Sequence, residues 1–107
     1  MPDKTGHPYL SEMKLGPIFA ALSDPVRLEV VLALATEPKI IRHCSSFNLP
    51  VSKQTRTHHF RVLRESGLIR QVDHGNSRTN QLRAVELNKK FPGLVETLLK
   101  AAKDAAG

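Results

Sequence analysis

The stretch VSKQTRTHHFRVLRESGLIR, residues 51–70, carries the clearest structural signals in the chain. Ser52 is a predicted helix N-cap, because its hydroxyl can accept a hydrogen bond from a backbone N–H of the first turn. Gly67 fits the left-handed position just past a helix end, with Leu68 following it as an apolar clamp. The stretch therefore predicts a helix over Lys53–Ser66.

A second well-marked helix is predicted upstream, in SDPVRLEVVLALATEP, residues 23–38. Asp24 is its predicted N-cap, Pro25 takes the first helical position, where a missing N–H costs nothing, and Pro38 marks its end. The following KIIRHCSSFNLP predicts a short helix over 40–47. A short turn then leads into the helix at 53–66, which is the spacing of a helix-turn-helix.

The periodicity changes from helical to alternating after this helix. The segment LIRQVDHGNSRTNQLRA, residues 68–84, holds two β-capable runs, Leu68–Val72 and Arg78–Leu82, separated by Gly75 and Asn76. This pattern predicts a hairpin. A helix-turn-helix followed by a hairpin is a winged helix, so the expected fold class is mainly α with a small β-hairpin, in the order α-α-α-α-β-β-α.

The two ends of the chain flank this unit. Residues 1–10 are expected to form a flexible N-terminal arm, and 11–107 the winged domain, since 107 residues suffice for one small core. Ser11 is a candidate N-cap for a first helix. The tail has apolar residues at helical spacing, and Pro92-Gly93 is expected to start a fresh helix there.

The helix at 53–66 has a polar face that suits DNA. On a helical wheel, Phe60 and Leu63 point inward together with positions 56 and 59, and the opposite side carries hydrogen-bond donors. The DNA major groove admits one helix, whose first residues reach base edges. A polar face can also be merely solvated, but of the net charge of +6 an excess of +5 lies in 51–83. The predicted DNA-binding residues are Ser52, Lys53, Gln54, Thr55, Arg56, Thr57, His58 and Arg61 on the helix and His74, Asn76 and Arg78 at the hairpin tip, with Arg70 and Arg83 as further backbone contacts.

Other chemistries are disfavoured. His58 and His59 are about 100° apart on a helix, so they cannot chelate one metal ion, and His59 is expected to be a partly buried histidine bonded to backbone. No Ser/His/Asp or Cys/His arrangement, glycine-rich phosphate loop or carboxylate pair indicates an enzyme. Cys44 is the only cysteine, which excludes an internal disulfide and fits a reducing cytoplasm. The sequence has neither a signal peptide pattern nor a membrane-spanning run.

Two segments resemble the ArsR-type (arsenic-repressor-like) family of bacterial winged-helix transcriptional regulators. ALSDPVRLEVVLAL resembles the family's second helix, and VSKQTRTHHFRVLRESGLIR resembles its recognition helix running into the first wing strand. The similarity covers residues 15–99. It implies a homodimer that binds a palindromic double-stranded DNA operator and represses transcription, with a dimer interface made by the first and last helices. The interface residues implied are Ile18, Phe19, Phe91, Leu94, Val95, Leu98 and Leu99.

The sequence departs from the metal-sensing members of that family. Their Cys-x-Cys pair falls on Ile41 and His43, or on Arg42 and Cys44, and neither register gives two thiolates. No histidine follows His74 to build a second type of site. We therefore expect no metal and no cofactor, and the effector stays unknown.

Two alternatives stay open from the sequence. One is a winged-helix protein-interaction module without nucleic acid, and the other is a redox-switched repressor acting through Cys44, although a lone cysteine is often an inert small hydrophobe.

Two further departures from the family pattern concern DNA binding. Arg56 stands where an aliphatic residue is usual, so it is expected to reach a phosphate. Asn80 replaces a common aromatic residue, which predicts a more polar wing.

Overall fold

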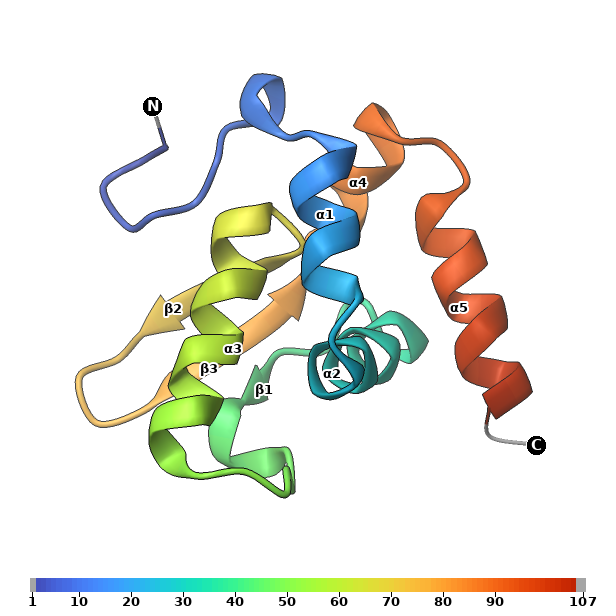
Figure 1. The fold of residues 1–107 in the computed structure, drawn as a ribbon. Coiled ribbons are helices and arrows are strands. Elements are labelled where there is room, and N and C mark those ends of the chain that lie inside the picture. Colours follow the sequence, from blue (N-terminus) through green and yellow to red (C-terminus); the bar gives the residue numbers. More distant parts are fainter. Residues whose placement is uncertain (1, 106–107) are drawn as a thin grey trace.

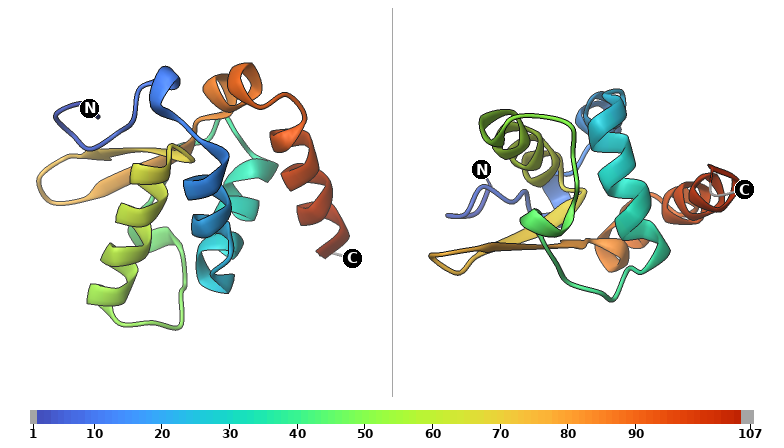
Figure 2. Two further views of the ribbon diagram at one scale, coloured as in Figure 1. Left: turned by 45° about the horizontal axis from the view of Figure 1, so that its top comes forward. Right: turned by 90° about the horizontal axis from the view of Figure 1, so that it is seen from below.

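Five α-helices and a three-stranded antiparallel sheet make up the part of the chain that the structure, a computed structural model, describes, residues 2–105. The wing strands and α5 lie at opposite ends of the molecule, with α1, α2 and α3 between them (Figures 1 and 2). The mainly helical winged helix-turn-helix predicted from the sequence is confirmed. The elements are α1 (Leu15–Leu22), α2 (Pro25–Thr36), β1 (Arg42–His43), α3 (Lys53–Ser66), β2 (Ile69–Asp73), β3 (Arg78–Leu82), α4 (Ala84–Lys90) and α5 (Leu94–Ala105), with 3-10 turns at Leu10–Glu12 and Cys44–Ser46.

The caps of the two central helices match their sequence signals. The Asp24 carboxylate accepts hydrogen bonds from the backbone N–H groups of Val26 at 2.8 Å and Arg27 at 3.1 Å. The Ser52 hydroxyl accepts one from the N–H of Thr55 at 3.2 Å. Gly67 ends α3 in the left-handed conformation, with φ 93°. These cap predictions are confirmed. They could be made from the sequence because each cap depends on residues close together in the chain.

Two helical predictions are wrong in detail. The segment 40–47 forms β1 and a 3-10 turn instead of a short helix, because Arg42 pairs with Asn80 of β3 and so adds a third strand to the hairpin. Ser11 lies inside the first 3-10 turn and caps no α-helix, since α1 begins at Leu15. The tail after the wing divides into α4 and α5 at Gly93, as the Pro-Gly pair predicts.

The sheet has the order β1-β3-β2, so β2 is an edge strand. Its register places Gln71 opposite Asn80 and Asp73 opposite Arg78. The strands leave the helical body beside α3 and project as a hairpin, which is drawn in side view in Figure 2. The wing and α3 therefore stand next to each other.

The core fixes α3 against the other helices. Phe60 and Leu63 on its inner face are fully buried and belong to one apolar cluster with Val31 and Leu34 of α2 and Ile18 of α1. The opposite face of α3 is left open to solvent.

The N-terminal segment is not the loose arm expected from its sequence. His7 and Pro8 are buried, and the backbone N–H of Gln71 in β2 donates to the His7 ring at 2.9 Å. Arg83 donates to the carbonyl of Pro8 at 2.9 Å. Partners far away in sequence hold this segment, which explains why its composition alone did not reveal the contact.

Replacing Gly67 by alanine is expected to destabilise the protein more than the same change at Gly75. Both glycines have positive φ, at 93° and 89°, so alanine at either costs about 1–2 kcal/mol. At Gly67 an added Cβ would also lie 2.9 Å from Met13 Cγ, whereas nothing lies within 4 Å at Gly75. Urea denaturation followed by circular dichroism measures both variants. Equal losses would contradict the packing role of Gly67.

Candidate nucleic-acid interface

The outer face of α3 presents hydrogen-bond donors to solvent. The side chains of Lys53, Gln54, Thr57, His58 and Arg61 are exposed, as are Ser52 and Thr55 at the start of the helix, whereas His59, Phe60 and Leu63 are buried. The helical-wheel prediction of inner and outer faces is therefore confirmed, with Arg56 half-buried at the boundary.

Local hydrogen bonds orient part of this face. The Thr57 hydroxyl donates to the carbonyl of Lys53 at 3.0 Å, which leaves its oxygen lone pairs free to accept. Arg61 Nη2 lies 3.3 Å from His58 Nδ1, and because a guanidinium can only donate, the imidazole accepts. The Ser52 hydroxyl donates to Thr55 Oγ1 at 3.0 Å. The open side of α3 thus offers both donors and acceptors to a ligand.

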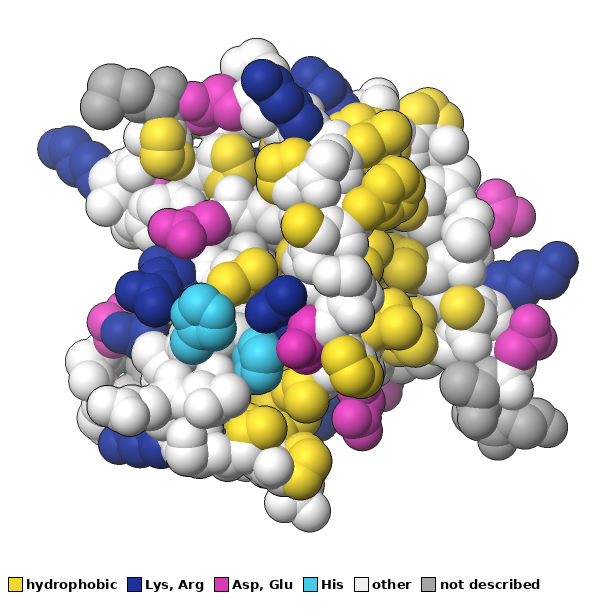
Figure 3. Space-filling model, viewed as in Figure 1, with side chains coloured by type: hydrophobic (Ala, Val, Ile, Leu, Met, Phe, Trp, Pro, Cys, Tyr) yellow, Lys and Arg dark blue, Asp and Glu magenta, His cyan; other side chains and the backbone are white. Residues whose placement is uncertain are grey.

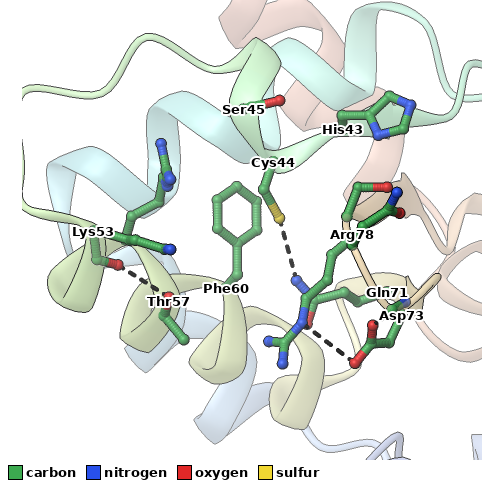
Figure 4. A pocket seen from close by; sticks show the side chains of 13 residues that line it. His43, Cys44, Ser45, Lys53, Thr57, Phe60, Gln71, Asp73 and Arg78 are labelled. Atoms are coloured by element: carbon green, nitrogen blue, oxygen red, sulfur yellow. Dashed lines mark hydrogen bonds and ion pairs between the residues drawn. The ribbon is translucent and has the colours of Figure 1, made fainter.

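A cleft of about 420 Å³ separates the first half of α3 from the wing. Figure 4 shows Lys53 and Thr57 on one side, Arg78 and Asp73 on the other, and Phe60 between them. Arg56 also lines this cleft, so three cationic side chains surround it. Asp73 approaches Arg78 at 3.7 Å, and neither Lys53 nor Arg56 forms an ion pair within residues 2–104. The cleft therefore carries an excess of positive charge.

The wing tip is held by a tight turn. The backbone N–H of His74 donates to the carbonyl of Ser77 at 2.8 Å, and that of Gly75 donates to the Asp73 carboxylate at 2.8 Å. His74 Nε2 lies 3.0 Å from Thr79 Oγ1, which orients its ring. His74, Asn76 and Arg78 are all exposed. Asn76 and Arg78 line the cleft that faces α3, whereas His74 does not line it.

Two predicted features of the wing are wrong. Arg83 is only 5% exposed, and its Nε donates to Glu86 Oε2 at 2.7 Å, so this arginine is part of the interior and cannot reach DNA. Asn80 is fully buried and does not make the wing surface polar. It donates to the Arg42 carbonyl at 3.3 Å, which fastens β1 to β3, and accepts from Gln71 Nε2 of β2 at 3.1 Å. Arg70 is exposed but lies 3.8 Å from Glu86.

The Arg83–Glu86 contact has an electrostatic consequence. Burial acts to raise the pKa of Glu86, but the hydrogen bond and the charge of Arg83 together lower this pKa below its ordinary value, with Arg70 adding to the effect. The carboxylate therefore stays ionised and holds Arg83 in the interior, while Arg70 stays exposed beside it.

The two histidines of α3 have different surroundings. His59 is buried, and its Nδ1 accepts from Arg27 Nη1 of α2 at 3.2 Å, so its partner is a side chain rather than the backbone we expected. Its Nε2 lies 4.0 Å from Asp24 Oδ1. No group of three or more His, Cys, Asp or Glu side chains in the described residues is arranged to hold a metal ion.

The cleft includes residues that the sequence did not place at this face. His43 and Cys44 line it because β1 pairs with β3, which is a contact between distant segments. The Cys44 thiol is half-buried and accepts from Asn80 Nδ2 at 3.1 Å and from Gln71 Nε2 at 3.5 Å. No local sequence signal announces this arrangement.

The residues expected at a dimer interface differ in exposure and divide into buried, half-buried and exposed side chains. Ile18 is fully buried in the core of its own chain, so it is not available to a partner, and Val95 and Leu98 are also buried. Phe19 is 55% exposed. Apolar side chains gather over α1 and beside α5 on the face shown in Figure 3. The half-buried members of the expected set are Phe91, Leu94 and Leu99.

Comparisons with known proteins agree with this geometry. A helix-turn-helix domain family matches residues 22–72, from the end of α1 into β2. A solved structure described as an ArsR-like transcriptional regulator from Rhodococcus sp. RHA1 is 31% identical, with 86% of each chain covered and a TM-score of 0.58. A second solved structure, described as an ArsR family transcriptional regulator, is 24% identical and shares the fold, with a TM-score of 0.59 over 86% of this chain and 94% of that one. The comparison with curated proteins gives no significant match.

The family model covers α2, α3 and most of β2, and the structural match extends over 86% of the chain. None of the helices in the described range is long and apolar enough to span a membrane. With 31% identity over most of both chains, the likeness extends well beyond the general winged-helix shape. The protein therefore belongs to the ArsR family of helix-turn-helix transcriptional regulators, a DNA-binding family that is not enzymatic.

Proposed function

We propose that this protein is a homodimeric, sequence-specific repressor that inserts α3 into the major groove of a palindromic operator and lays its wing on the DNA backbone or the adjacent minor groove. The observation that carries the proposal is the donor-rich outer face of α3 beside a cleft with unpaired cations. Unpaired lysine and arginine side chains attract phosphates and release counterions from DNA.

The proposal gives the exposed residues distinct roles. Gln54 and His58 lie on the open face near the helix start and are assigned to base edges. Ser52 and Thr55 are assigned to a phosphate at the helix N-terminus, where backbone N–H groups point outward. The remaining assignments to the sugar-phosphate backbone or minor groove are Lys53, Arg56, Thr57 and Arg61 on α3 and His74, Asn76 and Arg78 on the wing.

The dimer rests on the apolar surface of the first and last helices. Phe19 and Leu15 of α1 are exposed large apolar side chains, and Leu94 and Leu99 of α5 are partly exposed. A contiguous apolar surface on a small soluble domain favours association. A two-fold dimer would present two copies of α3 to two half-sites of a palindrome. Such a regulator acts on the chromosome, so we place it in the cytoplasm.

Single substitutions are expected to separate base reading from backbone binding. Gln54→Ala or His58→Ala should weaken operator preference by about 1–3 kcal/mol while leaving affinity for random DNA nearly unchanged. Arg78→Ala should weaken binding to every sequence and reduce the salt slope by about 1. Fluorescence anisotropy on the protein's upstream region and on scrambled DNA measures both effects. Lys100→Ala on exposed α5 is the control, and an absence of binding by the wild type at low salt would refute the proposal.

The alternatives have separate tests. A protein-interaction module would contact an acidic protein through the same cations, and heparin or random DNA would then compete poorly. Redox switching through Cys44 stays a prediction, since its thiol lies in the cleft but is half-buried. Equal operator binding by wild type and Cys44→Ser, before and after oxidant, would exclude it.

A further inference from the structure

Residues 3–9 form a closed loop around one carboxylate. Asp3 Oδ1 accepts hydrogen bonds from the backbone N–H groups of Thr5 and His7, each at 2.9 Å, and from the Thr5 hydroxyl at 2.7 Å. The Thr5 hydroxyl and the His7 backbone bond are the main causes that lower the pKa of Asp3 to about 2. The loop therefore keeps a charged acceptor at its centre throughout the physiological pH range.

The imidazole of His7 joins this loop to the wing. The ring is 2% exposed, and its Nε2 lies 2.9 Å from the backbone nitrogen of Gln71 on the edge strand β2. A backbone N–H can only donate, so Nε2 is the acceptor and the proton of the neutral ring lies on Nδ1. Nδ1 is 2.6 Å from Thr5 Oγ1, so Nδ1–H donates to the Thr5 hydroxyl oxygen. The Thr5 hydroxyl in turn donates to Asp3. A directed chain of hydrogen bonds thus runs from Gln71 through His7 and Thr5 to Asp3.

Gln71 is also the point where three other elements meet. Its Oε1 accepts from Arg64 Nη1 of α3 at 2.8 Å, and its Nε2 donates to Asn80 Oδ1 of β3 at 3.1 Å and to Cys44 Sγ at 3.5 Å. The same loop supplies the Pro8 carbonyl that Arg83 binds. The position of the loop is therefore coupled through Gln71 to the recognition helix, the wing and the floor of the cleft.

The contact between His7 and Gln71 exists only while the ring is neutral. A protonated ring carries N–H groups on both nitrogens, so Nε2–H would point at the N–H of Gln71 inside a buried contact. The charged groups around the ring come from several elements. Asp3 in the loop, 3.8 Å away, favours the protonated form, whereas three arginines disfavour it. They are Arg64 of α3, Arg70 of β2 and Arg83 after β3, the last two also facing Glu86 of α4.

We propose that residues 3–9 are a proton-sensitive latch on the wing: neutral His7 holds β2 against α3, and protonation of His7 releases the loop and loosens the wing. Burial is the main cause that lowers the pKa of His7 below its ordinary value. A histidine whose pKa is lowered in the docked state stabilises that state fully above pH of about 6.5, the pKa of the free side chain. Below that pH the docked state loses stability. The equilibrium constant for opening the loop rises by at most about tenfold for each pH unit.

The latch is testable without DNA. In the ¹⁵N-labelled full chain, titrated from pH 7.5 to pH 5, we expect the amides of residues 3–7 and of Tyr9 to gain fast motion in heteronuclear NOE experiments. The amide signal of Gln71 should shift in the same transition, with a midpoint below the ordinary pKa of histidine, because the pKa of His7 is lowered. His74→Gln, which removes an exposed histidine of the wing, should keep the transition. His7→Gln should abolish the transition, because glutamine does not titrate. This holds whether residues 3–9 of the variant are docked or free.

Two results would overturn the latch. One is a wild-type loop that stays equally rigid from pH 7.5 to pH 5, and the other is a His7→Gln protein that shows the wild-type transition. The effect on DNA rests on the proposed function and is measured separately, as operator affinity at pH 7.5 and pH 5.5. Wild type and His7→Gln share every other histidine, so the ratio of the wild-type affinity to the His7→Gln affinity should fall severalfold in acid. A protein that binds no DNA at either pH would refute the proposed function and leave the NMR test of the latch intact.

Discussion

Replacement of Phe60 by alanine is expected to lower the free energy of unfolding by about 3–5 kcal/mol. Phe60 is 1% exposed on the inner face of α3, and its ring centroid lies 5.6 Å from that of Phe47. The substitution removes apolar packing and leaves a cavity where α3 lies against the core. Small domains have total stabilities of about 5–15 kcal/mol, so a large share of the stability would disappear.

Urea denaturation of the variant measures this effect. Val85→Ala on α4 is the control, because Val85 is 65% exposed and should change stability by less than about 0.5 kcal/mol. A decrease in the free energy of unfolding of less than about 1 kcal/mol for Phe60→Ala would mean that this ring does not anchor α3. The position of the outer face of α3 would then need another cause.

Removal of the three cations around the cleft is expected to weaken binding to all DNA sequences by a hundredfold or more. Lys53, Arg56 and Arg78 line the same cleft from α3 and the wing. If each forms one charge-assisted hydrogen bond to a phosphate, binding weakens by about 1 kcal/mol or more per residue. The variant with all three changed to glutamine should also show a shallower salt dependence, by about 0.9 in slope for each phosphate that is no longer neutralised.

A matched variant separates local binding from net charge. Changing Lys89, Lys100 and Lys103 to glutamine removes the same charge from exposed positions on α4 and α5. Anisotropy measured over a series of salt concentrations should show a small decrease in affinity for this control. Equal decreases in the two variants, both confirmed as folded by thermal denaturation, would mean that only the overall charge matters and that the cleft does not touch DNA.

The sequence predicts those parts of the fold that depend on neighbours in the chain. Ser52, Asp24 and Gly67 define helix ends through bonds to residues two to four positions away. The hairpin follows from two β-capable runs around Gly75, whose φ is positive as the turn requires. These local rules were enough to place α2, α3 and the wing.

Contacts between distant segments account for the errors. The strand β1 replaces a predicted short helix because the side chain of Asn80 binds the Arg42 carbonyl across 38 residues. Arg83 is turned inward by Glu86 and by the Pro8 carbonyl, which is 75 residues away. The N-terminal loop is docked by a bond between His7 and Gln71. Charge and composition alone do not reveal such partners.

The candidate site was predictable in its helix and less so in its surroundings. The inner and outer faces of α3 follow from helical periodicity, including the separation of His58 from His59. The cleft is made by three segments that meet only in the folded chain, so Cys44 and His43 could not be placed there beforehand. The roles of individual residues in reading DNA stay predictions.

Binding of DNA by α3 and the wing can be mapped on the protein itself. ¹⁵N-labelled protein is titrated at low salt with a duplex from its own upstream region, and the amide shifts are compared with those caused by scrambled DNA. We expect the largest changes at residues 52–61 of α3 and 74–78 of the wing, with the first group responding most strongly to the specific sequence. Changes confined to α1 and α5, or no changes at all, would contradict a DNA-reading role for this face.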